Sequence, residues 1–177
     1  MIYTFTDTDR SLALEAAERV RELEAAGLVV QDAQIAEAIN AGNMPLDNFT
    51  AHYRGCLAEI AVAVVTDLEW GGHWAGGIDV LPNVEVKSVT RSYWGPYLRP
   101  ADLDDDRVYT LVAAYLEDDQ TCMILGWCRL LNGYVKAQDC AQRNYQHCCK
   151  HYKDTGNVRI NRRHLRPITT LNPEAYQ

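Results

Sequence analysis

The sequence predicts an α/β protein in which helices flank a central mixed β-sheet. Three observations lead to this fold class. Residues 11–26 and 48–70 have the composition and apolar spacing of helices. Apolar segments at 78–81, 84–90, 108–116 and 121–130 have the composition of strands. A further helical segment at 137–152 and a short strand at 158–161 follow them.

The N-terminal part is predicted to be helical. Residues 11–26, SLALEAAERVRELEAA, are strong helix formers with apolar residues at helical spacing, and Gly27 follows as a stop signal. A second, shorter helix is predicted over 32–40. We interpret residues 1–47 as an N-terminal helical extension and residues 48–177 as the main domain.

The predicted helix at 48–70 looks buried on more than one side, because apolar residues occupy nearly all of its circumference. Asn48 or Thr50 is a suitable N-cap. Glu59 is a carboxylate in the middle of this apolar helix. It either pairs locally or reaches solvent, or it belongs to a functional site.

Residues 78–81 and 84–90 flank the turn pair Pro82-Asn83 and predict a β-hairpin. Residues 92–106 are predicted to form a loop, and its acidic run DLDDD is most simply solvated. The strands 108–116 and 121–130 are joined by the short turn EDDQ.

Composition narrows the class of protein. With 47% hydrophobic and 23% charged residues, the chain resembles an ordinary globular protein. No apolar run is long enough to predict a membrane span, and the N-terminus lacks the features of a signal peptide, so we expect a cytoplasmic protein. The six cysteines are then expected to be thiols. Zinc binding remains an alternative for the cluster formed by Cys140, His147, Cys148, Cys149 and His151.

Charge is unevenly distributed along the chain. Residues 1–119 contain 8 Lys or Arg and 21 Asp or Glu, a balance of −13, whereas residues 120–177 contain 9 and 3, a balance of +6. Such asymmetry suggests a surface for a polyanion. The alternative is a solvated basic tail around the run VRINRRHLR.

The stretch GGIDVLPNVEVKS places three charges in an apolar hairpin. Glu85 and Lys87 are two residues apart, so they share one face of a strand. A pairing of Val80 with Val84 would bring Asp79 opposite Glu85, whereas a pairing shifted by one residue would separate them. We predict a bulge or bend that brings Asp79 to the Glu85 face. The three charges then form either an ion network or a site for a hard divalent cation.

GGIDV followed by VEVKS resembles the D…(D/E)-x-K signature of the PD-(D/E)XK nuclease superfamily, with Ile78 in place of the nominal proline. RGCLAEIAVA, which contains Glu59, resembles the glutamate-bearing helix that often precedes the hairpin in this family. The later strands, the helix and the basic segment INRRHLRPITTL also match. The resemblance covers residues 50–170 approximately, most closely the small single-domain nucleases of bacteriophages. It implies a restriction-endonuclease-like fold.

The resemblance also implies a metal-dependent nuclease. Asp79, Glu85 and the Val86 carbonyl would hold Mg²⁺ or Mn²⁺, and Glu59 would complete this site or help a second ion. Lys87 would orient the attacking water or help to deprotonate it, since burial readily lowers a lysine pKa. The expected substrate is nucleic acid; DNA is the favoured substrate, and RNA is the alternative that the sequence leaves open.

The basic residues expected to contact phosphates are Arg91, Arg99, Arg159, Arg162 and Arg163. Whether the protein forms a homodimer is left open. Two alternatives to the nuclease are a binding module for nucleic acid or protein that retains the nuclease fold without catalysis, and a zinc-stabilised binding protein.

Overall fold

The structure is a computed structural model that describes residues 1–27, 47–72, 78–89, 91–104, 110–142 and 156–172. Its centre is a four-stranded mixed sheet in the order β1-β5-β4-β2. The strands are β1 (Ile2–Thr4), β2 (Val84–Val89), β4 (Thr110–Leu116) and β5 (Thr121–Arg129). β2 pairs with β4 in parallel and the other pairs are antiparallel. Because β2 stands last in this order, it is an edge strand within the described part of the chain. The predicted α/β class with a mixed sheet and flanking helices is confirmed.

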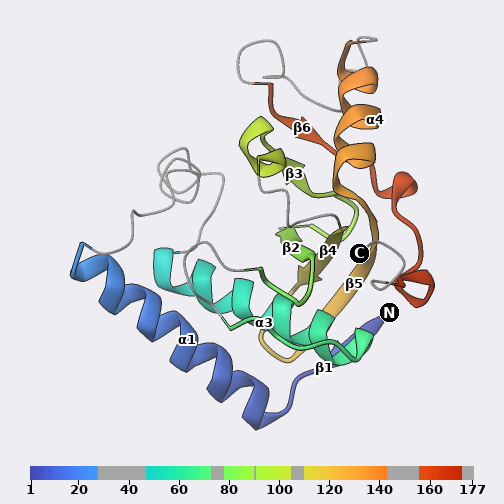
Figure 1. The fold of residues 1–177 in the computed structure, drawn as a ribbon. Coiled ribbons are helices and arrows are strands. Elements are labelled where there is room, and N and C mark those ends of the chain that lie inside the picture. The colour runs from blue at the N-terminus through green and yellow to red at the C-terminus, as the bar shows by residue number, and fades with distance from the viewer. Residues whose placement is uncertain (28–46, 73–77, 90, 105–109, 143–155, 173–177) are drawn as a thin grey trace.

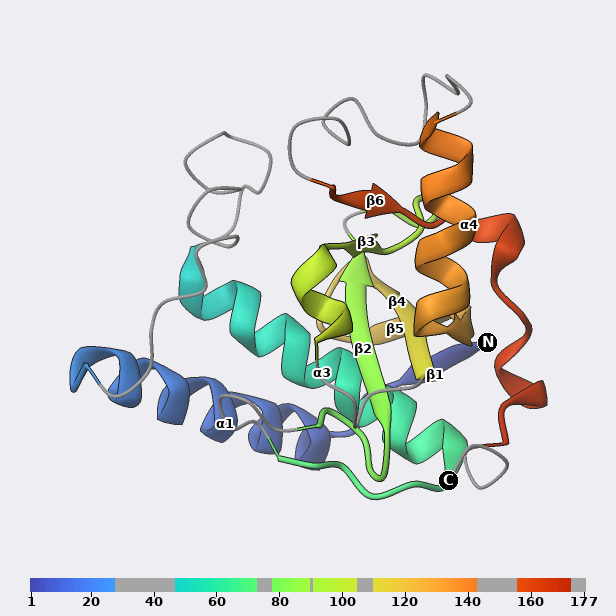
Figure 2. The same ribbon diagram turned by 45° about the horizontal axis from the view of Figure 1, so that its top comes forward.

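The sheet lies between two layers (Figures 1 and 2). Helix α3 (Asn48–Thr66) packs on one face of the sheet, and α1 (Asp7–Ala25) packs on α3. The other side carries α4 (Leu130–Gln142) and a small antiparallel sheet of β3 (Tyr97–Leu98) and β6 (Val158–Arg159). The short 3₁₀ helices are η1 (Pro100–Leu103), η2 (Arg162–His164) and η3 (Ile168–Thr170).

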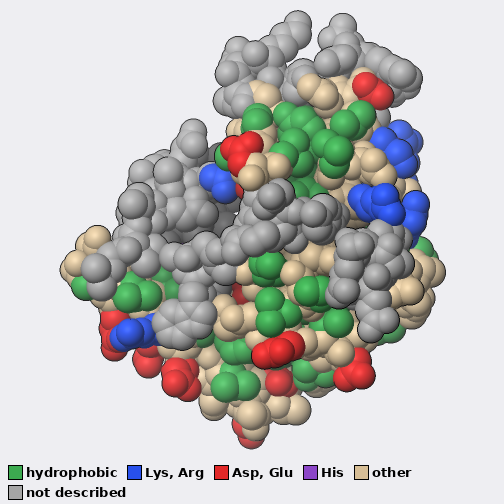
Figure 3. All heavy atoms as spheres, in the orientation of Figure 1, with side chains coloured by type: hydrophobic (Ala, Val, Ile, Leu, Met, Phe, Trp, Pro, Cys, Tyr) green, Lys and Arg blue, Asp and Glu red, His purple; other side chains and the backbone are tan. Residues whose placement is uncertain are grey.

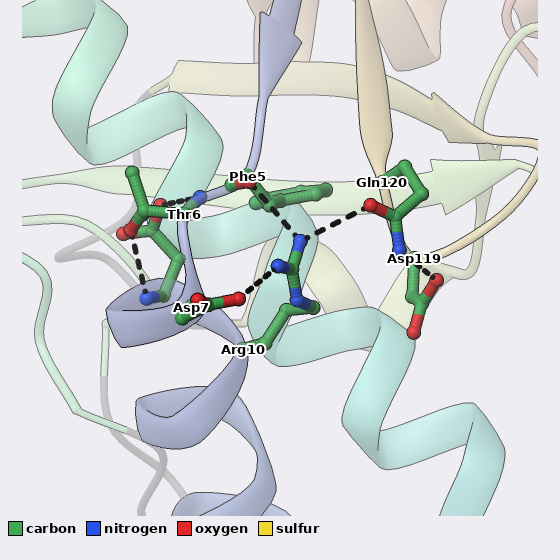
Figure 4. Close-up of polar contacts among 7 residues, drawn as sticks. Phe5, Thr6, Asp7, Arg10, Asp119 and Gln120 are labelled. Atoms are coloured by element: carbon green, nitrogen blue, oxygen red, sulfur yellow. Dashed lines mark hydrogen bonds and ion pairs between the residues drawn. The ribbon is translucent and has the colours of Figure 1, made fainter.

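Helix α1 begins four residues earlier than predicted because a capping box fixes its start. The Thr6 hydroxyl accepts a hydrogen bond from the Asp9 N–H at 3.2 Å, and the Asp9 carboxylate accepts one from the Thr6 N–H at 2.8 Å. Arg10 then donates to the Phe5 carbonyl at 3.1 Å and to Gln120 at 3.4 Å (Figure 4). These contacts fasten the first turn of α1 to the turn between β4 and β5.

The N-terminal residues take part in the central core. β1, which was not predicted, pairs with β5. Phe5 and Ala13 are 4% and 0% exposed and belong to the same apolar cluster as α3. The division at residue 47 stays a prediction, but residues 1–27 share both sheet and core with the predicted main domain. The predicted helix 32–40 lies outside the described residues.

Helix α3 is buried almost all round, as its sequence predicts: every residue from Cys56 to Ala63 is at most 5% exposed. Its N-cap is Asp47, whose carboxylate accepts the Thr50 N–H at 2.7 Å, so the prediction of Asn48 or Thr50 as the cap was wrong. The helix stops after Thr66 and is closed by Asp67, which has a left-handed backbone with φ 55°.

Strands β4 and β5 lie where they were predicted, whereas α4 starts at Leu130 directly after β5 instead of at residue 137. Its predicted end beyond residue 142 and the Cys/His cluster at 147–151 lie outside the described residues. Among the described helices, none combines the length and the apolar character needed to cross a membrane.

Candidate functional site

The chain turns back with the register that the site requires, but the predicted strand at 78–81 is reduced to an isolated bridge at Val80. Val80 and Val84 exchange both backbone hydrogen bonds, at 3.0 and 2.9 Å, so the loop is Leu81-Pro82-Asn83, which contains a cis Leu81–Pro82 bond. In this register the chain returns with Asp79 beside the free edge of β2, on the side away from β4.

A third segment holds this returning chain in place. The Gly71 N–H donates to the Asp79 carbonyl at 3.0 Å, and the Leu81 N–H donates to the Glu69 carbonyl at 2.9 Å. Trp70 is thereby paired with Val80. Hydrogen bonds to residues 69–71 on one side and to Val84 of β2 on the other therefore fix the backbone of residues 79–81.

The Asp79 side chain is bonded to β2. Its carboxylate accepts the Val86 N–H at 2.7 Å. In a strand, the N–H and C=O of one residue point to the same side, as in the hydrogen-bonded pairs of antiparallel sheets. The Val86 carbonyl therefore points toward the same free edge as Asp79. This is the pair of oxygen donors that the sequence predicted, although a backbone contact to Asp79 was not anticipated.

Glu85 and Lys87 approach from one face of β2. In the parallel register they align with Leu111 and Ala113, and Leu111 belongs to the apolar cluster of the β3–β6 side. The alternate residue Val86 packs in the α3 cluster. The side chains of Glu85 and Lys87 therefore point away from α3.

Glu59 approaches from the other face. It is 5% exposed on α3, and its carboxylate accepts the Trp70 indole N–H at 3.0 Å. Sequence inspection missed Trp70, which gives no signal except its place in a glycine-rich loop. Asp79 thus lies at the edge of β2 with Glu59 on the α3 side and Glu85 on the opposite side.

The electrostatics of Asp79 reflect this crowding. Burial, followed by the charges of Glu59 and Glu85, raises the pKa of Asp79 well above its ordinary value of 3.8. The Val86 N–H and Lys87 oppose this shift without cancelling it. Asp79 is therefore protonated more readily than an exposed aspartate, chiefly because it is buried.

Cys56 lies one turn before Glu59. Burial, with smaller contributions from Glu59 and Asp79, raises the pKa of its thiol far above the ordinary value. A thiol in such surroundings is unreactive, so we assign Cys56 to packing.

Lys87 is held by two carboxylates. Its Nζ lies 2.7 Å from Glu85 Oε1 and 3.7 Å from Asp102 Oδ1. Burial by itself would lower the pKa of Lys87, but Glu85, Asp102 and Asp79 together raise it above the ordinary value of 10.5. Lys87 is therefore a cation in this arrangement, which corrects the expectation that burial makes it a base.

Asp102 was missed as a member of the site. It lies in η1 with a side chain 10% exposed, so this first residue of the acidic run is not solvated. Arg99 donates to Asp102 from its backbone N–H at 2.7 Å and from its guanidinium at 3.0 and 3.3 Å. Arg99, predicted to contact phosphates, is thus bound to the carboxylate that also approaches Lys87.

The other predicted phosphate contacts fall into two groups. Arg91, Arg159 and Arg162 converge on the loop 91–97 that follows β2. Arg163 is exposed on η2 and donates to His164 at 3.3 Å. In Figure 3, acidic side chains gather along the lower part of the visible face, and basic ones gather along its right side.

No family model, curated protein or solved structure matches this chain. Among the residues that the structure describes, no three His, Cys, Asp or Glu side chains are grouped as ligands of one ion. Two of the expected ligands are engaged elsewhere, since Glu59 accepts from Trp70 and Glu85 is paired with Lys87.

Proposed function

We propose that the chain is a metal-dependent nuclease of the PD-(D/E)XK type with a restriction-endonuclease-like fold. The observation that carries the proposal is the position of Asp79. Its carboxylate bonds to Val86 at the free edge of β2, and Glu59 and Glu85 flank it from opposite faces. Lys87 lies beside them. These are the residues that the sequence resemblance singles out.

The donor set fits a hard divalent cation in its chemistry. Carboxylate and carbonyl oxygens are the ligands that Mg²⁺ and Mn²⁺ prefer. Burial raises the pKa of Asp79 most, and the neighbouring charges of Glu59 and Glu85 raise it further; a bound cation would offset this second contribution. Asp79, Glu85 and the Val86 carbonyl would hold the ion, and Glu59 would complete the site or assist a second ion.

A bound Mg²⁺ or Mn²⁺ would supply Lewis acidity, which lowers the pKa of a coordinated water and neutralises charge on the phosphate. Lys87 provides the second positive charge. Since it remains protonated, we assign it to orienting the water and stabilising the charge that develops on the phosphoryl oxygens. Asp102 is a positioning residue in this scheme, because it would act through its ion pair with Lys87.

The proposal is tested by incubating the full chain with linear, supercoiled, single-stranded and branched DNA in Mg²⁺, Mn²⁺ or EDTA. We expect cleavage that requires the metal and is abolished by Asp79→Asn and by Lys87→Ala. The matched controls Asp139→Asn and Lys136→Ala change exposed residues of α4 and should cleave normally. Absence of cleavage on every substrate, or normal cleavage by Lys87→Ala, would refute the proposal.

The second candidate is a non-catalytic module that retains this fold. The observation that favours it is the closed pairing of Lys87 with Glu85 and Asp102, which satisfies the site without any ligand. It predicts nucleic-acid or protein binding that is unaffected by EDTA and by Asp79→Asn.

A further inference from the structure

The loop after β2 contributes to a cluster of aromatic and basic side chains on the molecular surface. We call it the Trp94 cluster, and its members are Arg91, Tyr93, Trp94, Tyr97, Arg159 and Arg162. Tyr93 is 63% exposed and Tyr97 is 39% exposed. The acidic groups of the candidate site are not part of the cluster.

Two arginine side chains, those of Arg91 and Arg159, lie over the ring of Trp94. The guanidinium carbon of Arg91 lies 4.6 Å from the centre of the Trp94 ring, and that of Arg159 lies 4.1 Å from it. Arg91 also donates to the Tyr93 hydroxyl at 2.7 Å, and Arg162 donates to the Ser92 carbonyl at 2.7 Å. Arg91 and Arg159 thus bring two guanidinium groups to one ring, and the planar N–H donors of guanidinium groups match phosphate oxygens.

The loop that carries these side chains is held tightly. The Ile160 N–H donates to the Pro96 carbonyl at 3.0 Å. A Cβ added at Gly95 would lie 1.7 Å from the Ile160 carbonyl oxygen, so only glycine permits this approach. Tyr97 is paired with Arg159 across β3 and β6. The cluster is therefore preorganised, which lowers the entropic cost of binding.

The chain connects the Trp94 cluster directly to the candidate site. β2 carries Glu85 and Lys87 and runs on into Arg91. After Tyr97, the chain enters η1, where Asp102 returns to lie 3.7 Å from Lys87. A nucleic acid strand bound at the Trp94 cluster would therefore be held by the same chain segment, from β2 to η1, that positions Lys87.

We propose that the Trp94 cluster binds unpaired nucleotides of a nucleic acid strand, with bases on the tyrosine rings and phosphates at the arginines. The inference rests on the proposed function in one respect, namely that the bound nucleic acid strand is the substrate that is cleaved. Binding itself does not require cleavage.

The exposed rings distinguish unpaired strands from duplexes. Base faces in a duplex are stacked on one another, whereas an unpaired base can stack on an aromatic side chain. An acidic peptide would satisfy the arginines equally well but would place no base on the exposed tyrosine rings. The combination of rings and guanidinium groups favours a single strand over both.

The test measures the anisotropy of a short labelled oligothymidylate titrated with the full chain in EDTA. We expect affinity at least tenfold higher than for the matching duplex, for an abasic oligomer of equal length and for polyglutamate. Tyr93→Ala and Tyr97→Ala should each weaken binding by about 5- to 150-fold, since stacking contributes about 1–3 kcal/mol per base. Tyr97→Phe keeps the ring and should bind within about threefold of wild type.

The arginines are tested through salt dependence. Arg91→Gln should reduce the slope of log affinity against log salt by about 0.7, as expected for one lost phosphate contact to a single strand. Arg19→Gln, an exposed change on α1, is the control and should leave the slope unchanged. Circular dichroism and thermal unfolding establish that each variant is folded.

The outcomes separate this inference from the proposed function. Equal affinity for the oligothymidylate and the abasic oligomer, equal binding of polyglutamate, or wild-type binding by both alanine variants overturns the inference even if metal-dependent cleavage is found. The expected binding pattern without any cleavage sustains the inference and overturns the nuclease.

Discussion

Gly71→Ala is expected to damage the site without touching any proposed ligand. A Cβ at this position would lie 1.9 Å from the Ile78 carbonyl oxygen, whereas such contacts essentially never fall below 3.0 Å, so the two segments must separate by about 1.1 Å. The obstructing atom is backbone and lies immediately before Asp79. It cannot rotate away as a flexible side chain would.

The magnitude follows from the contacts that must yield. The Gly71–Asp79 and Leu81–Glu69 hydrogen bonds hold this arm at 3.0 and 2.9 Å. Each is expected to contribute about 0.5–1.5 kcal/mol, so losing both costs about 1–3 kcal/mol. For a chain of this size that corresponds to a fall in Tm of about 2–12 °C. Misplacing Asp79 by about 1 Å is expected to reduce the cleavage rate about 10²-fold.

The assay compares Gly71→Ala with Gly55→Ala by thermal unfolding and by the initial rate of DNA cleavage. Gly55 lies within α3, and an added Cβ there has no atom within 4 Å. Its replacement should stabilise the helix by about 0.5–1 kcal/mol and leave cleavage intact. If Gly71→Ala unfolds at the wild-type temperature and cleaves at the wild-type rate, the packing of this arm does not position Asp79.

Three further predictions concern the charges. Asp79→Asn should change how stability depends on pH. Because the pKa of Asp79 is higher in the folded than in the unfolded protein, Asp79 stabilises the wild type at low pH, and this contribution is lost as pH rises through the folded pKa. In EDTA, the Tm of the variant should therefore rise relative to that of wild type as pH increases from 4 to 8. Parallel Tm profiles would contradict this. Asp102→Asn should lower the free energy of unfolding in urea by about 1.5–3 kcal/mol, because it weakens the charged hydrogen bonds from Arg99. It should also slow cleavage, because Lys87 loses one of the two carboxylates that position it. An unchanged free energy of unfolding would refute the role of these hydrogen bonds. Trp70→Phe removes the donor to the buried glutamate of α3 and should cost about 1–3 kcal/mol, with wild-type stability as the contrary result.

Much of the site could be predicted from the sequence because its signals are local. The two-residue spacing of Glu85 and Lys87 fixes their shared face. Because side chains alternate between the faces of a strand, Asp79 can meet them only when Val80 pairs with Val84. Burial of α3 around Glu59 follows from its apolar circumference. The alternation of side chains could not show which face of β2 is covered by α3 and which by the β3–β6 side, because that depends on the packing of distant elements.

The missed features depend on contacts between distant residues. Asp102 has the sequence surroundings of a solvated loop, and only the path through η1 brings it to Lys87. Gly133 follows an asparagine and suggests a turn, yet it lies within α4. A Cβ there would be 2.6 Å from Ile160 Cδ1 and 2.7 Å from Cys128 Sγ, so a larger residue would require these side chains to shift.

The hydrogen bond between Asp79 and Val86 has a consequence for self-association. β2 is an edge strand, and an edge with free N–H and C=O groups can recruit a strand from another molecule. The arm at Val80 and the Asp79 carboxylate cover two successive outward-facing positions of this edge. Asp79→Ala would uncover the Val86 N–H and invite strand addition by a second copy, whereas Asn keeps an acceptor there. We therefore expect the side chain proposed to hold the metal also to hinder strand addition at this edge.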